Sequence, residues 1–378
     1  MLKRYLMAPG PTEVPSEVLA ALGKPTMHHR LPAFSDLFMK VSEDLKKFFM
    51  TKNDVYSFAS SGTGALESAV VNLLSAGDEA ICVRGGKFGE RWAEICTAYG
   101  VKAINLDVEW GDVAKPEQIE ELLKANPNVK AVFTTLCETS TAVVTPVKDI
   151  AAVVAKTDAV LVTDAVSAIG ALELRTDDWR VDVVVAGSQK ALMLPPGMGF
   201  ITLSDKAWKL VESSTLPKYY FDLKKAKKTL GNKTTAFTPP VNMFYALEAA
   251  LELILEEGME NIWTRTSKLG AASRAAAQAL GLKLYSKVPA DNLTAVCVPE
   301  GIDGGKFTKV LRDKYGITIA GGQADLKGKI FRISTMGYSD RMDIPLVFSA
   351  IEMVLAEMGH PVERGAGVKA AEEALADF

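Results

Sequence analysis

Two side chains that follow apolar runs could do chemistry together. A carboxylate, Asp164, ends the apolar run at 160–163, and an amine, Lys190, lies shortly after the apolar run at 181–186. In an open parallel sheet the carboxyl ends of the strands meet at one edge, where ligands bind. Taken singly, each residue would more often be a surface ion-pair member or a helix cap. Arriving at the same edge, they predict a site.

A third segment, SSGTGALE at 60–67, follows the apolar run at 55–59. Free backbone amides at such a strand-to-helix turn, together with the helix dipole, suit a phosphate, although a plain capped turn is the alternative. A dinucleotide fingerprint is a poor match, because Glu67 replaces its third glycine. An amine, a carboxylate and a phosphate cradle are the parts of a pyridoxal-phosphate site: a Schiff-base former, a partner for the pyridinium nitrogen and an anchor.

These residues need a sheet to position them. Short apolar runs at 55–59, 80–83, 103–106, 131–135, 160–163, 181–186 and 200–203 alternate with amphipathic segments, which predicts buried strands separated by helices. Their continuous hydrophobicity is typical of a mainly parallel sheet covered on both faces. We therefore expect a three-layer α/β domain.

The pattern changes after about Lys206, where a polar stretch leads to two prolines and a long helical region. From about residue 261 the sequence predicts a helix, a strand at 293–298, a helix at 306–315, a strand at 329–334 and a helix from Asp343. The expected organisation is an N-terminal arm (1–15), a large α/β domain (16–257) and a smaller α+β domain (258–378). Gly365 and Gly367 predict a short C-terminal helix that is detached from the rest.

Composition narrows the class of partner. The 378 residues are 48% hydrophobic and 24% charged with a formal net charge of -3, which argues against nucleic acid and favours small metabolites. The lysines at 224–228 are typical of a solvated face. Four cysteines without CxxC spacing fit a reduced, cytoplasmic setting. The four-residue apolar run at 5–8 is too short for a signal peptide or a membrane span.

The sequence also resembles, along nearly its whole length, the class V aminotransferases of the fold-type I pyridoxal-phosphate enzymes, most of all the alanine-glyoxylate and serine-glyoxylate (serine-pyruvate) group. That resemblance implies the fold-type I architecture with a smaller C-terminal α+β domain. The matching stretches are APGP at 8–11, SGTG at 61–64, FGER at 88–91, ETST at 138–141, DAVS at 164–167, GSQKA at 187–191 with PPG at 195–197, and FRI at 331–333.

The resemblance assigns roles to particular residues. It implies that Lys190 forms the Schiff base, that Asp164 pairs with the pyridine nitrogen through a carboxylate of depressed pKa, and that Phe88 stacks on the ring. Some relatives have tryptophan in place of Phe88, a change that should alter cofactor affinity more than chemistry. The remaining assignments are Ser61, Gly62, Thr63 and Gln189 for the phosphate, Thr235 and Thr238 for the phosphate from a second subunit of a homodimer, Thr139 near the ring oxygen, and Arg332 with Gly10 for the substrate carboxylate.

The implied reaction is a ping-pong transfer of an amino group from a small amino acid, alanine or serine, to glyoxylate or pyruvate. Small donors are expected because Arg332 is the one arginine assigned to a carboxylate, and a dicarboxylic donor would need a second cation. Aspartate, phosphoserine and ureidoglycine remain open as donors. His28, His29 and Arg30 lack the spacing and extra ligands of a metal site, so we expect no metal there and a structural role, near the mouth of the site at most.

Three other functions compete. A cysteine desulfurase of the same fold would usually have histidine where Gln189 precedes the lysine. A nicotinamide-dependent dehydrogenase would need the missing glycine. A non-catalytic subunit is the third, because similar chains have been labelled as hydrogenase-associated, but retention of Lys190, Asp164 and Arg332 together argues against a scaffold without activity.

Overall fold

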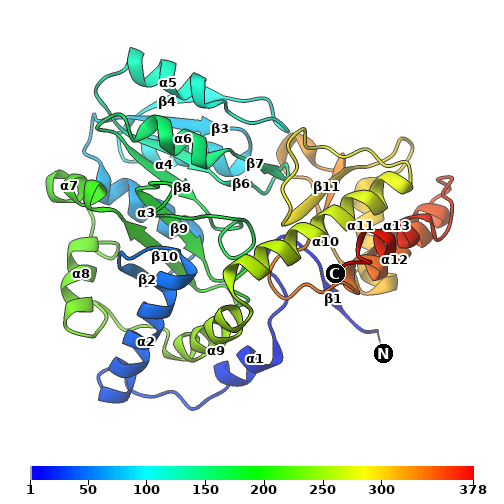
Figure 1. Cartoon of the computed structure of the whole chain (residues 1–378), viewed down its shortest axis with the longest axis horizontal. Coiled ribbons are helices and arrows are strands. Elements are labelled where there is room, and N and C mark those ends of the chain that lie inside the picture. The colour runs from blue at the N-terminus through cyan, green and yellow to red at the C-terminus, as the bar shows by residue number, and fades with distance from the viewer. Residues whose placement is uncertain (1) are drawn as a thin grey trace.

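A seven-stranded sheet forms the centre of the computed structural model, which describes residues 2–378 (Figure 1). Strand β10 of this sheet runs antiparallel to both of its neighbours, and the other pairs of adjacent strands are parallel. In spatial order the strands are β2 (Val55–Ala59), β10 (Met198–Leu203), β9 (Val183–Gly187), β8 (Val160–Asp164), β5 (Val129–Thr135), β3 (Glu79–Arg84) and β4 (Lys102–Asp107). This arrangement confirms the predicted α/β class.

The central strands β8, β9 and β10 are buried at every residue, so helices must cover both faces of the sheet. This explains why their sequences are continuously apolar rather than alternating. The helices of this part of the chain are α1 (Ser16–Leu22), α2 (Pro32–Phe48), α3 (Gly62–Leu73), α4 (Lys87–Ala98), α5 (Pro116–Ala125), α6 (Val147–Val154), α7 (Asp205–Ser213), α8 (Leu223–Gly231) and α9 (Val241–Glu257). A short hairpin, β6 (Cys137–Glu138) with β7 (Val143–Val144), lies beyond the end of β5.

The C-terminal part of the chain forms a second, smaller unit around an antiparallel sheet in the order β11 (Leu293–Cys297), β14 (Ile330–Ser334) and β13 (Ala320–Gly321). Its helices are α10 (Met259–Ala279), α11 (Gly304–Tyr315), α12 (Asp343–Glu357) and α13 (Ala366–Ala374), with a 3-10 turn at Ala324–Leu326. The N-terminal strand β1 (Tyr5–Leu6) pairs with β12 (Ile317–Thr318) of this unit. In Figure 1 the helix α10 extends from the sheet domain into the smaller unit.

Two hydrophobic clusters correspond to the two parts. The first surrounds the large sheet, and the second contains Phe331, Phe348 and other apolar residues of the C-terminal unit. Along α10, Met259 and Ile262 belong to the first cluster and Leu269 to the second. The exact division at 257/258 therefore stays a prediction.

Two sequence-based expectations were wrong in detail. The strand expected from 181 begins at Val183, because the Asp182 carboxylate instead accepts the Leu161 amide at 3.0 Å and the Ser204 hydroxyl at 2.7 Å. The polar stretch after Lys206, to which we assigned no helix or strand, folds into α7 and α8, and the lysine run lies on α8.

The C-terminal helix α13 is present but is not detached. The buried Glu352 carboxylate accepts the amides of Gly365 at 2.6 Å and Gly367 at 2.9 Å, which fixes the start of this helix against α12. Helix α13 also packs closely on α10. The two glycines thus permit a sharp turn and do not act as a flexible linker.

Candidate active site

A cavity lies at the carboxyl edge of the large sheet, where the sequence predicted that Asp164 and Lys190 would meet. Both residues line it, together with residues from the start of α3, the start of α4 and the β6 hairpin. The full lining is Ser61, Gly62, Thr63, Leu66, Phe88, Arg91, Cys137, Thr139, Asp164, Val166, Ser167, Gln189 and Lys190. Most of the residues proposed from sequence therefore meet in one place.

Lys190 follows β9 and extends toward the N-terminal arm. Its Nζ donates a hydrogen bond to the carbonyl oxygen of Pro9. Gly10 has a φ of +111°, and a Cβ there would lie 2.3 Å from the Lys190 Nζ, so glycine is needed for both conformation and space. Burial lowers the pKa of Lys190 to about 8, so a substantial fraction of the amine is neutral near physiological pH.

Asp164 ends β8 and is only 5% exposed. Its Oδ1 accepts the Val166 amide at 2.8 Å, and within residues 2–378 its Oδ2 has no hydrogen-bond donor. Burial raises the pKa of Asp164 to about 6 in the chain by itself, and the depressed pKa that we expected for its pairing with a ring nitrogen stays a prediction. Loss of hydration outweighs the single amide and the nearby charges of Arg91 and Lys190. A cation beside Oδ2 would reverse that balance.

The N-terminus of α3 lies where the sequence predicted an anion cradle. Ser61 is the N-cap, with its Oγ accepting the Gly64 amide at 3.4 Å, and Gly62 and Thr63 are the first residues of the helix. A Cβ at Gly62 would lie 2.7 Å from Val166, so a larger residue would intrude. Gln189 has a buried Oε1 without a partner in the described part of the chain, so its amide is uncommitted. With the buried amine and carboxylate, this donor set fits pyridoxal phosphate.

Arg332 lies on the central strand of the smaller sheet and is 4% exposed. Its Nη1 donates to the Thr139 carbonyl at 2.7 Å, and its Nη2 donates to the Gly321 carbonyl at 2.7 Å. No carboxylate of residues 2–378 lies within 4 Å of it, so it is not a member of a surface ion pair. Burial lowers the pKa of Arg332 to about 10, which leaves it charged at neutral pH. Among the residues described, this buried cation has no acidic partner.

Sequence reasoning assigned no role to Arg91, Ser167 or Cys137, which also line the cavity. The Nη1 of Arg91 donates to Thr63 Oγ1 at 3.1 Å, and its Cζ lies 5.0 Å from the centroid of the Phe88 ring. The hydroxyls of Ser167 and Thr139 lie 2.6 Å apart. Arg91 and Ser167 stand inside stretches that match the family, which was the available signal. Nothing in the sequence pointed to the buried thiol of Cys137.

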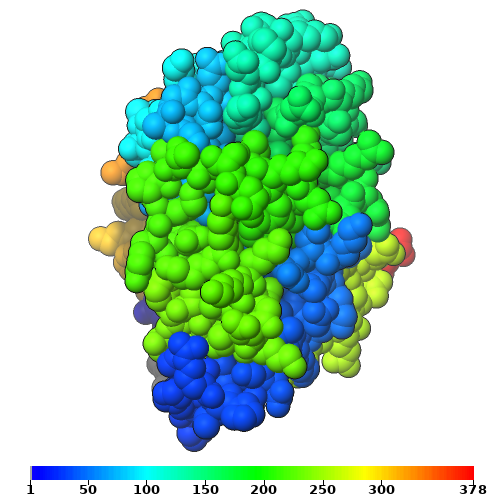
Figure 2. All heavy atoms as spheres, turned by 90° about the vertical axis from the view of Figure 1, so that its left-hand side faces the viewer, coloured from blue at the N-terminus to red at the C-terminus, as the bar shows by residue number. Residues whose placement is uncertain are grey.

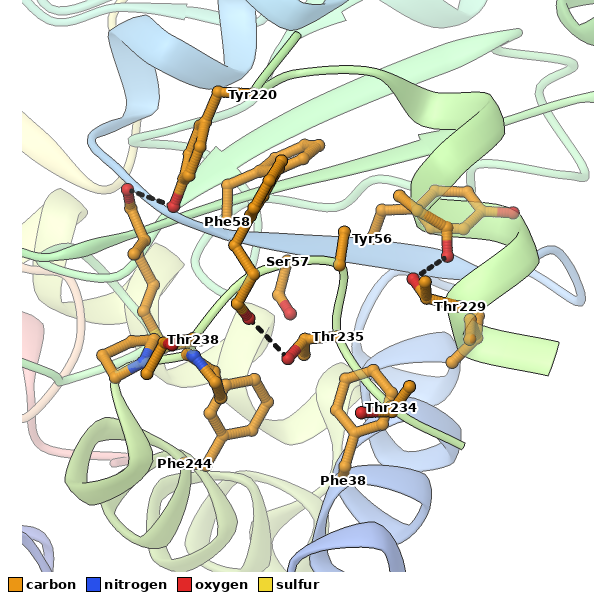
Figure 3. A pocket seen from close by; sticks show the side chains of 18 of the residues that line it. Phe38, Tyr56, Ser57, Phe58, Tyr220, Thr229, Thr234, Thr235, Thr238 and Phe244 are labelled. Atoms are coloured by element: carbon orange, nitrogen blue, oxygen red, sulfur yellow. Dashed lines mark hydrogen bonds between the residues drawn. The ribbon is translucent and has the colours of Figure 1, made fainter. Parts of the chain in front are cut away.

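Thr235 and Thr238 lie elsewhere, in a second pocket between β2 and the segment that leads into α9 (Figure 3). The Thr235 hydroxyl donates to the Phe237 carbonyl at 2.8 Å. The neighbouring Thr234 accepts a 2.9 Å hydrogen bond from Arg30. Within one chain, these threonines are therefore not brought to the Lys190 cavity.

Figure 2 shows the face on which this segment lies, with residues of the 200–240 region next to the N-terminal helices. His28 and His29 stack on each other with ring centroids 4.8 Å apart. No group of three or more potential metal ligands occurs within residues 2–378. In the same range, no helix combines the length and apolar character needed to cross a membrane.

The family model for class V aminotransferases matches residues 4–347. The chain therefore belongs to the class V aminotransferase family, whose members are pyridoxal phosphate-dependent enzymes.

Three similar proteins show what is shared and what varies. A soluble hydrogenase small subunit of Synechococcus is 42% identical over 99% of this chain and 98% of its own. An L-aspartate–glyoxylate aminotransferase of Paracoccus denitrificans is 37% identical over 97% and 95%. The crystal structure of ureidoglycine-glyoxylate aminotransferase from Bacillus subtilis superposes with a TM-score of 0.96 at 32% identity, covering 100% of this chain and 99% of that one.

Proposed function

We propose that the protein is an active transaminase in which Lys190 binds the cofactor covalently and Asp164 faces the ring nitrogen. The observation that carries this proposal is the juxtaposition of a partly neutral, largely buried amine and a buried carboxylate in one cavity. Strongly perturbed titrating groups that share a cleft are typical of active sites. A structural role for both groups would leave two buried ionisable side chains without ion-pair partners, which is destabilising.

When bound, pyridoxal phosphate supplies an aldehyde that takes up an amino group and returns it to a second substrate, and a protonated ring that draws electrons from the substrate Cα. The residues of the chain perform the remaining tasks. Asp164 Oδ2 would keep the ring nitrogen protonated, and Phe88 would stack on the ring. Lys190 Nζ would take up and carry the proton that leaves the substrate Cα.

The anion-binding groups divide into two sets. The start of α3, with Ser61, Gly62 and Thr63, binds the cofactor's phosphate together with Gln189. We assign Arg91 to the same phosphate, because it is bonded to Thr63 beside that cradle. Arg332 is left to take the α-carboxylate of the substrate in a bidentate pairing, and Gly10 stays close to the reacting amine.

We propose a small amino acid, alanine or serine, as donor and glyoxylate or pyruvate as acceptor in a ping-pong reaction. Two of the three similar proteins have glyoxylate in their names, which supports that acceptor. Their donors differ, so the donor rests on the pocket: Arg332 is the cation that we leave for substrate. Aspartate, phosphoserine and ureidoglycine are the alternatives.

A second subunit completes this proposal. Thr235 and Thr238 lie outside the cavity of their own chain, as expected for residues that contact the phosphate in a partner's site. Size measurement of the purified protein, together with cofactor retention by a T235A/T238A variant, tests this homodimer. A monomer that retains its cofactor fully would contradict it.

The deciding experiment is a half-reaction screen. The purified protein should be yellow, lose its visible absorbance on adding L-alanine or L-serine, and regain it with glyoxylate or pyruvate. A faster half-reaction with L-aspartate than with L-alanine would contradict the donor assignment. A colourless protein that is indifferent to pyridoxal phosphate would favour the non-catalytic alternative suggested by the hydrogenase-subunit relative.

A further inference from the structure

Glu138 is a buried carboxylate that the proposed reaction does not use. It is 4% exposed, and no Lys, Arg or His nitrogen within residues 2–378 comes within 4 Å of it. Burial raises its pKa, while its hydrogen bonds oppose that change. An acid in such surroundings is retained in the folded protein only if its oxygens are well satisfied. Backbone amides and one hydroxyl, which come from two different segments, satisfy these oxygens.

The first of these segments is the start of helix α4. This helix has no side-chain cap of its own at Gly86. Instead Oε2 of Glu138 accepts the amide of Phe88 at 3.1 Å and the amide of Gly89 at 2.9 Å. A negative charge at a helix N-terminus is favourable because it faces the positive end of the helix dipole. A Cβ at Gly86 would lie 2.4 Å from Glu138 Cδ, so glycine gives the carboxylate room to approach.

The second segment is the turn between β6 and β7. The Oε1 of Glu138 accepts the Ser140 amide at 3.1 Å and the Ser140 hydroxyl at 2.5 Å. Between these two residues lies Thr139, whose carbonyl accepts the guanidinium of Arg332 at 2.7 Å. The position of this carbonyl therefore depends on how Glu138 and Ser140 hold the turn.

We propose that Glu138 is a positioning residue that fixes Phe88 relative to Arg332. The groups for ring stacking and for carboxylate binding are then both placed by one side chain. The inference rests on the proposed function, in which Phe88 faces the cofactor ring and Arg332 binds the substrate. A carboxylate suits this task because every group around it is a donor. A glutamine would turn an NH₂ group toward N–H groups on one side or the other.

The test uses the full-length holoenzyme and E138Q, with two measurements: the dissociation constant of pyridoxal phosphate, by absorbance titration of cofactor-free protein, and the half-reaction with L-alanine. We expect E138Q to raise both the cofactor dissociation constant and the KM for L-alanine by about 10-fold, since it leaves buried donors unpaired. By comparison, F88A should act mainly on the cofactor and R332K mainly on KM. In an E138Q/F88A double variant the two effects on cofactor affinity should not add.

Glu90 offers a matched control on the same helix. It pairs with Lys87 at 2.9 Å and does not line the cavity, so E90Q should leave both measurements unchanged. If E138Q lowers the melting temperature but changes neither cofactor affinity nor KM, Glu138 is merely structural and the inference is wrong.

If E138Q does not fold, S140A provides the readout. It removes the hydroxyl donor of the turn while leaving both α4 amides bonded to Glu138. We expect a KM increase of roughly 3-fold with little change in cofactor affinity, and an unchanged KM would overturn the inference. A wild-type protein inert to every amino acid would instead refute the proposed function, whereas an active wild type with an indistinguishable variant refutes this inference alone.

Discussion

The side-chain Nδ2 of Asn292 donates a 2.5 Å hydrogen bond to the carbonyl oxygen of Ser167, which lines the cavity, and this bond joins the smaller unit to the large domain. Asn292 immediately precedes β11 of the smaller sheet and is completely buried. Its Oδ1 accepts the thiol of Cys137 at 3.3 Å. One amide thus holds two cavity-lining loops against the sheet that carries Arg332.

Replacing Asn292 with alanine should destabilise the protein by about 1–3 kcal/mol, because the Ser167 carbonyl loses its buried donor. Cofactor affinity should fall as well, since both loops line the cavity. Chemical denaturation and cofactor titration measure the two effects. N126A, which removes an amide bonded only to the Leu122 carbonyl at the end of α5, should leave cofactor affinity unchanged. Unaltered cofactor affinity in N292A would show that the two cavity-lining loops keep their positions without this side chain.

Replacing Lys190 with methionine should abolish the half-reactions, a loss of at least about 100-fold, because the group that accepts the Cα proton is gone. Borohydride treatment of the wild type should fix a pyridoxyl label to the peptide that contains Lys190. A label on another lysine, or turnover retained by K190M, would move the reaction centre elsewhere.

The pH dependence of cofactor capture follows from the pKa of Lys190, which burial lowers to about 8. Only the neutral amine attacks an aldehyde, so the initial rate at which cofactor-free protein binds pyridoxal phosphate should rise with pH through 8 and level off above about 9. A solvated model amine such as an N-acetyl-lysine ester should keep gaining rate up to about pH 10.4. A protein profile that tracks the model amine would mean that Lys190 is well hydrated in solution.

Replacing Asp164 with asparagine should slow the half-reaction with L-alanine by about 10- to 100-fold, because a charge-assisted bond to the ring nitrogen becomes a neutral one. Stopped-flow absorbance measures this rate. Asp182 is another buried aspartate of the sheet, but it bonds Leu161 and Ser204 away from the cavity. D182N should therefore lower stability without a comparable loss of rate, and equal losses in the two variants would point to a general folding defect.

Replacing Arg91 with glutamine should weaken binding of pyridoxal phosphate by about 10-fold while leaving binding of pyridoxal, which has no phosphate, nearly unchanged. Arg84 is a control, because its guanidinium pairs with Asp107 at the surface. Equal losses for both aldehydes would assign Arg91 to the support of the Phe88 ring. A selective loss of reaction with L-aspartate would assign it to a second substrate carboxylate instead.

Periodicity and composition were sufficient to predict the sheet. Strands such as Val55–Ala59 and Val160–Asp164 were anticipated almost to the residue, because a strand buried on both faces leaves an unbroken apolar run. Polar side chains determine local structure in ways that these patterns do not reveal. Strand β9 begins only after Asp182, whose carboxylate accepts the Leu161 amide, and the lysine-rich stretch forms helix α8, which begins at the Asp222 cap.

The same contrast holds for the site. Lys190, Asp164 and the start of α3 could be anticipated, since each follows a recognisable strand and topology brings such ends together. The raised pKa of Asp164 could not, because it depends on how much water the folded cavity removes. The contribution of Asn292 was equally hidden, since an asparagine 125 residues from Ser167 in sequence gives no local signal.

The N-terminal arm contacts both the smaller unit and the amine of Lys190. Its β1 pairs with β12 of the smaller unit in a separate two-stranded sheet, and a few residues later the Pro9 carbonyl accepts a hydrogen bond from the amine of Lys190. Any shift of the smaller unit would therefore be transmitted, through a tether of a few residues, to the nucleophile itself. Removing the residues of β1 should blunt the reactivity of Lys190, although these residues do not line the cavity.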